Sequence, residues 1–184
     1  MGEIHRCPWG DVVDALMRDY HDNEWGKPCR DERRLFEMLT LEGAQAGLSW
    51  RTILHKREAY KAAFDDFDVA KVAAYDESKI AELLQNPGLV RNRLKIRAAV
   101  TNARALLRLG SLSDFIWGYV DGKPVVNAWE RQEQLPATSP LADKISRDMK
   151  KLGFKFVGGT IVYSYLQAVG LVNDHLVWCG HRGI

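Results

Sequence analysis

A glutamate at the predicted end of a helix, Glu42, has the most suggestive surroundings of any acidic residue in this sequence. It follows Leu41 in the run Leu-Glu-Gly-Ala-Gln-Ala-Gly-Leu-Ser-Trp, which ends at Trp50. Gly43 and Gly47 can each end a helix in a left-handed conformation, so the carboxylate is predicted near a helix C-terminus, where the macrodipole disfavours it. An acid in this place indicates a binding group; the alternative is a solvated glutamate on a helix end.

Four other residues, two near each end of the chain, have the chemistry of metal ligands: Cys7, His21, His175 and Cys179. The last two are four residues apart, so on a helix they would face the same way, as in half of a tetrahedral zinc site. The first two can supply the other half, which leaves no open position and predicts a structural ion. His5 and His181 are competing ligands, and buried Cys and His without a metal are a further alternative.

The most basic part of the chain runs from Leu83 to Ser113. It contains no Asp or Glu, and its basic residues are Arg91, Arg93, Lys95, Arg97, Arg104 and Arg108. Arginines at a helix N-terminus oppose the helix dipole unless an anion binds there, and together with the free N–H groups they can hold a phosphate. A helix, a turn at Asn86-Pro87-Gly88 and a second helix therefore predict a grip on the DNA backbone. A solvated basic helix face is the alternative.

Composition describes an ordinary globular chain of one domain. It has 184 residues, 46% of them hydrophobic and 27% charged, with a net charge of +2, so DNA binding would need a local basic surface. Three cysteines are too few for a disulfide framework. The N-terminus has no apolar signal segment and no run approaches the length of a membrane span, so we expect a cytoplasmic protein.

Helical periodicity and caps dominate the pattern, and no strand pattern is visible, which predicts an all-α fold. Predicted helices begin after Asp31, Ser49 (to about Phe64), Asp68, Asp76, Asn92 (to Leu109), Ser111 or Ser113, and Ser139, and the last runs from Thr160 to Ala168. In the helix after Asn92, Leu94, Ala98, Thr101, Ala105 and Leu109 are expected to face the core. The last helix is apolar nearly all round, so we expect it to be buried, and Asn173 or Asp174 is expected to cap the turn that carries His175.

Four runs of residues carry a resemblance to a known family. They are Tyr20-His21-Asp22-Asn23-Glu24-Trp25-Gly26, the run around Glu42 and Trp50, Phe154-Lys155-Phe156-Val157-Gly158, and Gly170-Leu171-Val172-Asn173-Asp174-His175. In these runs, and over essentially its whole length, the sequence resembles DNA-3-methyladenine glycosylase I, the Tag-type family of helix-hairpin-helix DNA glycosylases. The resemblance implies that the chain hydrolyses the N-glycosidic bond of N3-methyladenine in alkylated double-stranded DNA and releases the free base.

The resemblance also implies roles for particular residues. It implies a zinc ion on Cys7, His21, His175 and Cys179, and a base pocket in which Glu42 hydrogen-bonds the extruded base and Trp50 stacks on it. Tyr20, Trp9, Trp25 and Ser164 would line that pocket. The hairpin with Arg91, Arg93 and Lys95 would hold DNA, and Leu48 could fill the gap left by the extruded base, with core packing as the alternative. Asp174 is a candidate for activating water, with capping as the alternative.

Two departures from the family pattern concern the pocket and the zinc ligands. Met17 stands where the family usually has a tyrosine, and the interval from Cys7 to His21 is one residue longer than expected. A glycosylase for another damaged base is therefore one alternative function, and a zinc-stabilised DNA-binding module without catalysis is the other. We expect a monomer with two lobes, about residues 1–40 plus 140–184 and about residues 41–139, the hairpin lying near 80–109.

Overall fold

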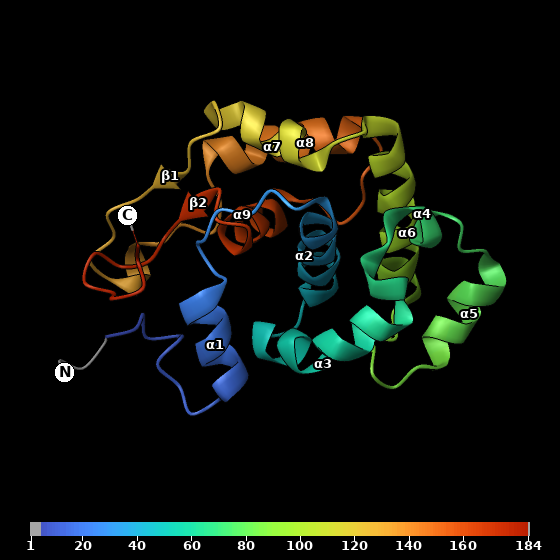
Figure 1. Ribbon diagram of the computed structural model, residues 1–184, viewed down its shortest axis with the longest axis horizontal. Helices are drawn as coiled ribbons and strands as arrows, with labels where there is room; N and C mark the ends of the chain where they lie inside the picture. Colours follow the sequence, from blue (N-terminus) through green and yellow to red (C-terminus); the bar gives the residue numbers. More distant parts are fainter. Residues whose placement is uncertain (1–4, 184) are drawn as a thin grey trace.

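The structure is a computed structural model, describes residues 5–183, and is built almost entirely of helices (Figure 1). The α-helices of this part of the chain are α1 (Ala15–Asn23), α2 (Glu32–Gln45), α3 (Trp50–Ala63), α4 (Val69–Ala73), α5 (Glu77–Gln85), α6 (Arg93–Leu109), α7 (Leu112–Trp117), α8 (Pro140–Lys151) and α9 (Gly159–Ala168). Short 3₁₀ helices are η1 (Asp65–Phe67), η2 (Gly118–Val120) and η3 (Gln132–Gln134). The all-α prediction is confirmed.

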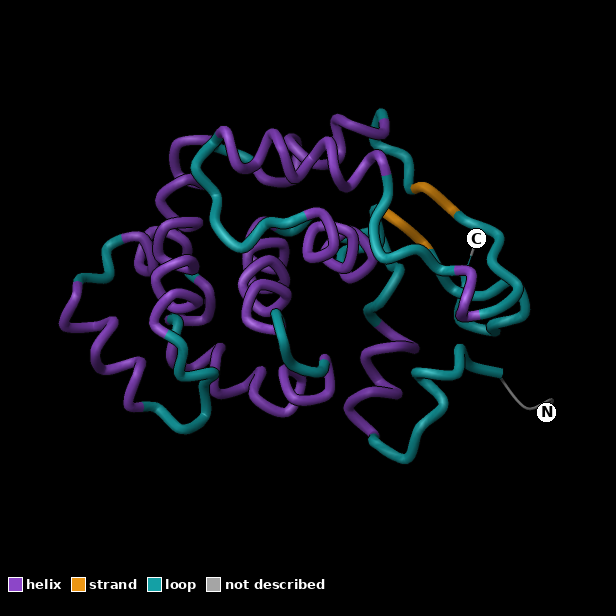
Figure 2. Tube along the Cα trace, turned by 180° about the vertical axis from the view of Figure 1, so that it is seen from behind, coloured by secondary structure: helices purple, strands orange, loops and turns teal. Residues whose placement is uncertain are grey.

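One small sheet was missed. Strands β1 (Val125–Val126) and β2 (Val172–Asn173) pair in parallel, with Val125 opposite Val172. Each strand has only two residues, which is too short for an alternating pattern to show in the sequence. The pair attaches the connection after α7 to the C-terminal segment (Figure 2).

Helix α2 is the centre of the molecule. Asp31 caps it by accepting a hydrogen bond from Arg34 N, and every residue from Leu35 to Ala44 is buried. It packs against α3, α6, α7 and α9, which surround it in Figure 1. Gly43 lies inside the helix and does not end it, contrary to one prediction, and Gly47 makes the left-handed turn with a φ of 78°. Glu42 is thus in the last turn of α2, as predicted.

The two helices of the basic segment are also present. Asp76 caps α5 and Asn92 caps α6, with a turn between them that begins at Asn86. Leu94 was predicted to face the core, but its side chain is 68% exposed. The buried residues of α6 begin two residues later, at Ile96, and the helix packs against α2, α4 and α5.

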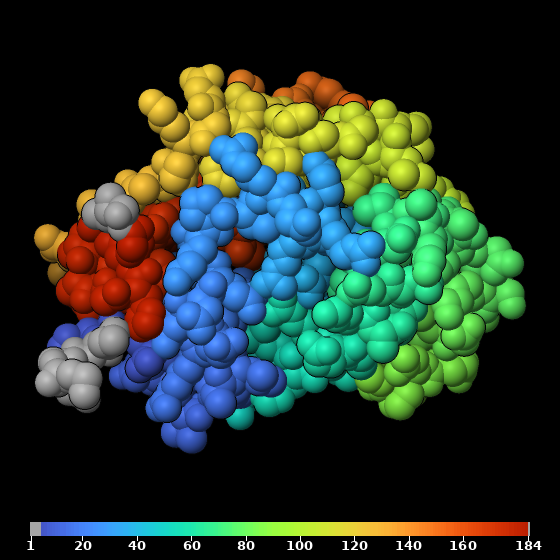
Figure 3. Space-filling model, viewed as in Figure 1, coloured from blue at the N-terminus to red at the C-terminus, as the bar shows by residue number. Residues whose placement is uncertain are grey.

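The two ends of the described chain lie against each other, as the blue and red surfaces of Figure 3 show. Gly180 N donates to the carbonyl of His5, and both strands belong to this region. The predicted division into two lobes stays a prediction. Its boundary near residue 40 lies inside α2. Within residues 5–183, none of the helices combines the length and apolar character needed to cross a membrane. Monomeric state and cytoplasmic location stay predictions.

Candidate active site

The four predicted metal ligands converge at the joined ends of the chain. Their ligand atoms all lie within 4.8 Å of one another, and all four side chains are buried. Cys179 Sγ is 3.4 Å from His175 Nδ1 and 3.7 Å from His21 Nε2, and Cys7 Sγ is 3.7 Å from His175 Nδ1. Ligands of a tetrahedral zinc ion with two sulfur and two nitrogen donors are roughly 3.3–3.8 Å apart, so the arrangement fits that metal.

The remaining ring nitrogens are occupied in a way that suits metal binding. His21 Nδ1 lies 2.8 Å from Asp22 Oδ1, and His175 Nε2 lies 2.9 Å from the carbonyl of Trp25. Such outer contacts orient the imidazoles of metal sites. Burial raises the pKa of the Cys7 thiol to about 12 and lowers that of His175 to about 4. A metal ion would supply the positive charge that a buried thiolate needs.

The turn predicted to carry His175 is present in the structure. His175 and Cys179 do not lie on a helix: they lie on turns after β2, where Cys179 N donates to Leu176 O. Asn173 is the residue that caps this turn, because its Oδ1 accepts a hydrogen bond from His175 N at 3.1 Å. The four-residue spacing therefore brings the ligands together through a folded turn instead of a helical face.

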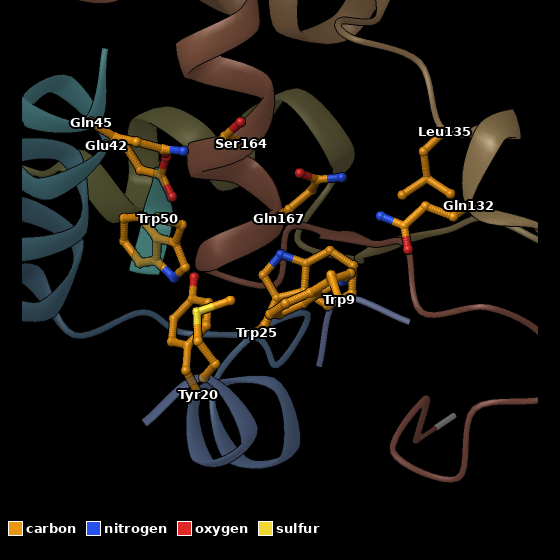
Figure 4. Close-up of a pocket in the computed structure, with 11 residues that line it drawn as sticks. Trp9, Tyr20, Trp25, Glu42, Gln45, Trp50, Gln132, Leu135, Ser164 and Gln167 are labelled. Atoms are coloured by element: carbon orange, nitrogen blue, oxygen red, sulfur yellow. The ribbon is translucent and has the colours of Figure 1, made fainter. Parts of the chain in front are cut away.

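A cavity of about 270 Å³ lies between α1, α2, α3 and α9 (Figure 4). Its lining residues are Trp9, Met17, Tyr20, Trp25, Glu42, Gln45, Trp50, Gln132, Leu135, Ser164 and Gln167. All six residues predicted for the pocket are among them. The rings of Tyr20 and Trp50 lie 5.1 Å apart, and those of Trp9 and Trp25 lie 4.9 Å apart, so aromatic surface dominates the walls.

Glu42 is the acidic group of this cavity. It is 5% exposed, and burial alone raises the pKa of its carboxyl group to about 8. The helix-end alternative required a solvated carboxylate, and this burial contradicts it. Trp50 Nε1 is also buried and has no hydrogen-bond partner in residues 5–183. A cavity with aromatic walls and a buried carboxyl group suits a flat ligand that is cationic or rich in donors.

Comparison with known proteins decides the family. A family model described as methyladenine glycosylase matches residues 9–182. The chain belongs to the methyladenine glycosylase family. It is 48% identical to DNA-3-methyladenine glycosylase 1 of Escherichia coli K12, with 96% of each chain covered, and 45% identical to DNA-3-methyladenine glycosylase of Haemophilus influenzae, with 95% of this chain and 96% of the relative covered.

A solved structure of the same family supports the fold. It describes 3-methyladenine recognition by 3-methyladenine DNA glycosylase I of Staphylococcus aureus, and it superposes with a TM-score of 0.94 at 39% identity, covering 100% of this chain and 99% of that one. Membership in a glycosylase family argues against the alternative of a non-catalytic DNA-binding module.

Sequence reasoning missed several lining residues of this methyladenine glycosylase. Gln167 lies three residues after Ser164, so the two share one face of α9 and the helical spacing could have found it. This face is only partly buried, which corrects the expectation that α9 is buried all round. Gln132 and Leu135 come from an irregular connection, where no periodic signal exists.

The basic residues that we predict to contact DNA, Arg91, Arg93 and Lys95, do not line the cavity. Arg91 is exposed, whereas Arg93 contacts Glu77 at 2.8 Å. Lys95 Nζ donates to the carbonyls of Ala44 and Ala46 at 2.9 and 2.5 Å, so it ties the start of α6 to the end of α2. The hairpin is therefore attached directly to the helix that carries Glu42.

The raised pKa of Glu42 predicts a dependence of stability on pH. Its folded-state pKa of about 8 lies above the ordinary 4.5, so the carboxyl releases its proton less readily in the folded protein. The cost to stability is absent below about pH 4.5, grows as the pH rises and is complete above about pH 8. We expect Glu42→Gln to unfold with a free energy up to about 4 kcal/mol higher than the native protein at pH 8, and equal to it near pH 4.5. Urea denaturation across this range measures the difference, and a constant difference at all pH values would contradict it.

Proposed function

We propose that this protein is a DNA repair enzyme that hydrolyses the N-glycosidic bond of N3-methyladenine in alkylated double-stranded DNA. The observation that carries the proposal is the buried carboxyl group of Glu42 in an aromatic cavity. Methylation at N3 gives the base a positive charge, which makes it both a good leaving group and a ligand for an anion. The family and the Staphylococcus aureus relative support this substrate.

The pocket residues would each contact the extruded nucleotide in a different way. Trp50 would stack on the base, while Glu42 would accept a hydrogen bond from its edge and attract its charge. Binding of a cation favours the ionised form of Glu42, which burial disfavours in the free protein. Leu48 is 43% exposed and lines a neighbouring cavity of about 180 Å³ that also contacts Glu42, so we assign it to the gap left in the base stack.

Release of free base tests this function. Duplex DNA treated with a methylating agent is incubated with the protein, and the released bases are separated and identified. We expect 3-methyladenine to be the main product. Release of a different damaged base in its place would favour the alternative prompted by Met17, and release of none would reject the glycosylase activity.

We propose that the Cys7, His21, His175 and Cys179 cluster holds one structural zinc ion. The donor set and the distances given above support this metal. Cys7 and His21 come from the N-terminal segment and the other two residues from the C-terminal one, so the ion would join both ends of the chain beside the pocket. His21 follows Tyr20 directly, which links the cluster to the pocket wall.

We propose that α5, the turn after it and α6 form a helix-hairpin-helix that binds the DNA backbone. We expect Arg91→Ala to weaken binding to every duplex alike, because phosphate contacts carry no sequence information, and to flatten the log–log salt dependence by roughly 0.9. Arg93→Ala should have the same effect once DNA competes with Glu77. Fluorescence anisotropy at several salt concentrations measures the slope.

The matched control for this test is Arg108→Ala. It removes the same charge from the other end of α6, where the side chain is also exposed, and should leave the slope unchanged. An unchanged slope in both Arg91→Ala and Arg93→Ala would move the DNA contact elsewhere, and the segment from Lys150 to Lys155 would be tested next.

A further inference from the structure

Asp174 is a buried carboxylate that the proposed mechanism does not use. It is fully buried and accepts hydrogen bonds from Asn127 Nδ2 and Trp129 Nε1 on Oδ1, and from Tyr163 OH and Gln167 Nε2 on Oδ2. These four bonds are 2.5–2.7 Å long, and with two donors on each oxygen they fill the acceptor positions of the side chain. Asp174 is therefore not a helix or turn cap, and it has no free position with which to activate water.

This carboxylate determines which way the amide of Gln167 faces. Because Asp174 Oδ2 accepts hydrogen bonds from both Tyr163 OH and Gln167 Nε2, the NH₂ group of Gln167 faces Asp174, and the oxygen Oε1 faces away from it. Gln167 lines the cavity, and Figure 4 shows its oxygen on the side of Glu42 and Trp50. The cavity thus contains a hydrogen-bond acceptor whose orientation is held from behind.

We propose that Gln167 is a specificity-determining residue whose Oε1 accepts a hydrogen bond from the amino group of the extruded methyladenine. The inference rests on the proposed function and deepens it. The N–H bonds of the amino group at C6 of adenine are donors, whereas guanine has a carbonyl acceptor at that position. An oriented Oε1 would accept a hydrogen bond from the amino group of adenine and repel the carbonyl oxygen of guanine. With guanine in the pocket, Oε1 and that carbonyl would both be buried without a partner.

Competition between two lesions tests this inference. One sample of methylated duplex that contains both 3-methyladenine and 3-methylguanine is treated with each variant, and the ratio of the two release rates gives the ratio of kcat/KM. We expect Gln167→Met, which keeps the length of the side chain but removes the acceptor, to lower the preference for 3-methyladenine by about tenfold. Damage to the fold alone would slow both releases by the same factor.

Gln132→Met is the matched control. Gln132 lines the same cavity from η3, but among residues 5–183 no carboxylate is bonded to its amide, which can turn to offer either its oxygen or its NH₂ group. We expect this variant to change both releases by the same factor. An unchanged ratio in Gln167→Met, in a protein that still releases 3-methyladenine, would overturn the inference and leave the proposed function intact. No release of 3-methyladenine by the native protein would instead overturn the proposed function.

Replacing Asp174 reverses the expected preference. Trp129 Nε1 can only donate a hydrogen bond. In Asp174→Asn the oxygen of the new amide must therefore face Trp129, and its NH₂ group must face Tyr163 and Gln167. The hydroxyl of Tyr163 can accept, and Gln167 must turn its own NH₂ group into the cavity. We expect 3-methylguanine release to rise relative to 3-methyladenine by more than about tenfold. A ratio shifted the other way would overturn the inference, and Gln167→Met remains decisive if Asp174→Asn does not fold.

Discussion

Glu42→Gln is expected to reduce the release of 3-methyladenine by about ten- to a hundredfold. The substitution keeps the size of the side chain but removes the charge and half of its acceptor capacity, and hydrogen bonds to charged groups contribute roughly 1.5–3 kcal/mol. Since the departing base still carries part of its positive charge in the transition state, the loss should appear in kcat/KM of the release reaction. Quantifying free base under single-turnover conditions measures it.

Binding to DNA without a base in the pocket separates this role from a general defect. A duplex with an abasic site should bind Glu42→Gln as well as it binds the native protein. Trp50→Ala should show the same contrast, because base–aromatic stacking contributes roughly 1–3 kcal/mol and is lost only when a base is present. Full release activity in Glu42→Gln would remove Glu42 from the pocket mechanism.

Glu37→Gln supplies a matched control on the same helix. Glu37 is 8% exposed, like Glu42 a buried acid, but it contacts Arg34 and Arg57 at 2.8 Å and does not line the cavity. Breaking these ion pairs should lower stability without slowing base release by the folded protein. Comparing base release and stability in Glu42→Gln and Glu37→Gln distinguishes a buried acid that binds substrate from one that stabilises the fold.

Loss of a metal ligand is expected to have the largest effect on stability. Cys179→Ser or His175→Ala should lose the proposed zinc ion, and we expect the free energy of unfolding to fall by several kcal/mol, because the ion would connect segments more than 150 residues apart. Elemental analysis of protein purified without chelator, followed by thermal denaturation, measures both effects.

The third cysteine provides the control for this experiment. Cys29 is half-buried and outside the cluster, so Cys29→Ser should keep one zinc ion per chain. Native protein without a stoichiometric metal would reject the zinc proposal. Retention of the metal in Cys179→Ser would mean that another side chain replaces it, with His181 as the neighbouring candidate.

Local rules of helix formation were enough to predict most of the elements. Asp31, Ser49, Asp76 and Asn92 are caps in the structure because each side chain can bond the first free N–H groups of the helix that follows. Residue chemistry also singled out the Cys/His cluster and Glu42 beside Trp50, whereas the pocket roles of Tyr20, Trp9, Trp25 and Ser164 came from the family resemblance. These features depend on residue type and on short spacing, which a sequence displays directly.

Features made by contacts distant in sequence required the tertiary structure. The exposure of Leu94 depends on where α6 meets its neighbours, and the β1–β2 pair joins segments 47 residues apart that are each too short to show an alternating pattern. The burial that raises the pKa of Glu42 comes from helices packed around α2. The orientation of Gln167 depends on Asp174, whose other partners include Trp129 and lie far along the chain. Residue types alone indicate which side chains can do chemistry, whereas packing sets their protonation and the direction in which they face, because both depend on the groups that surround a side chain in space.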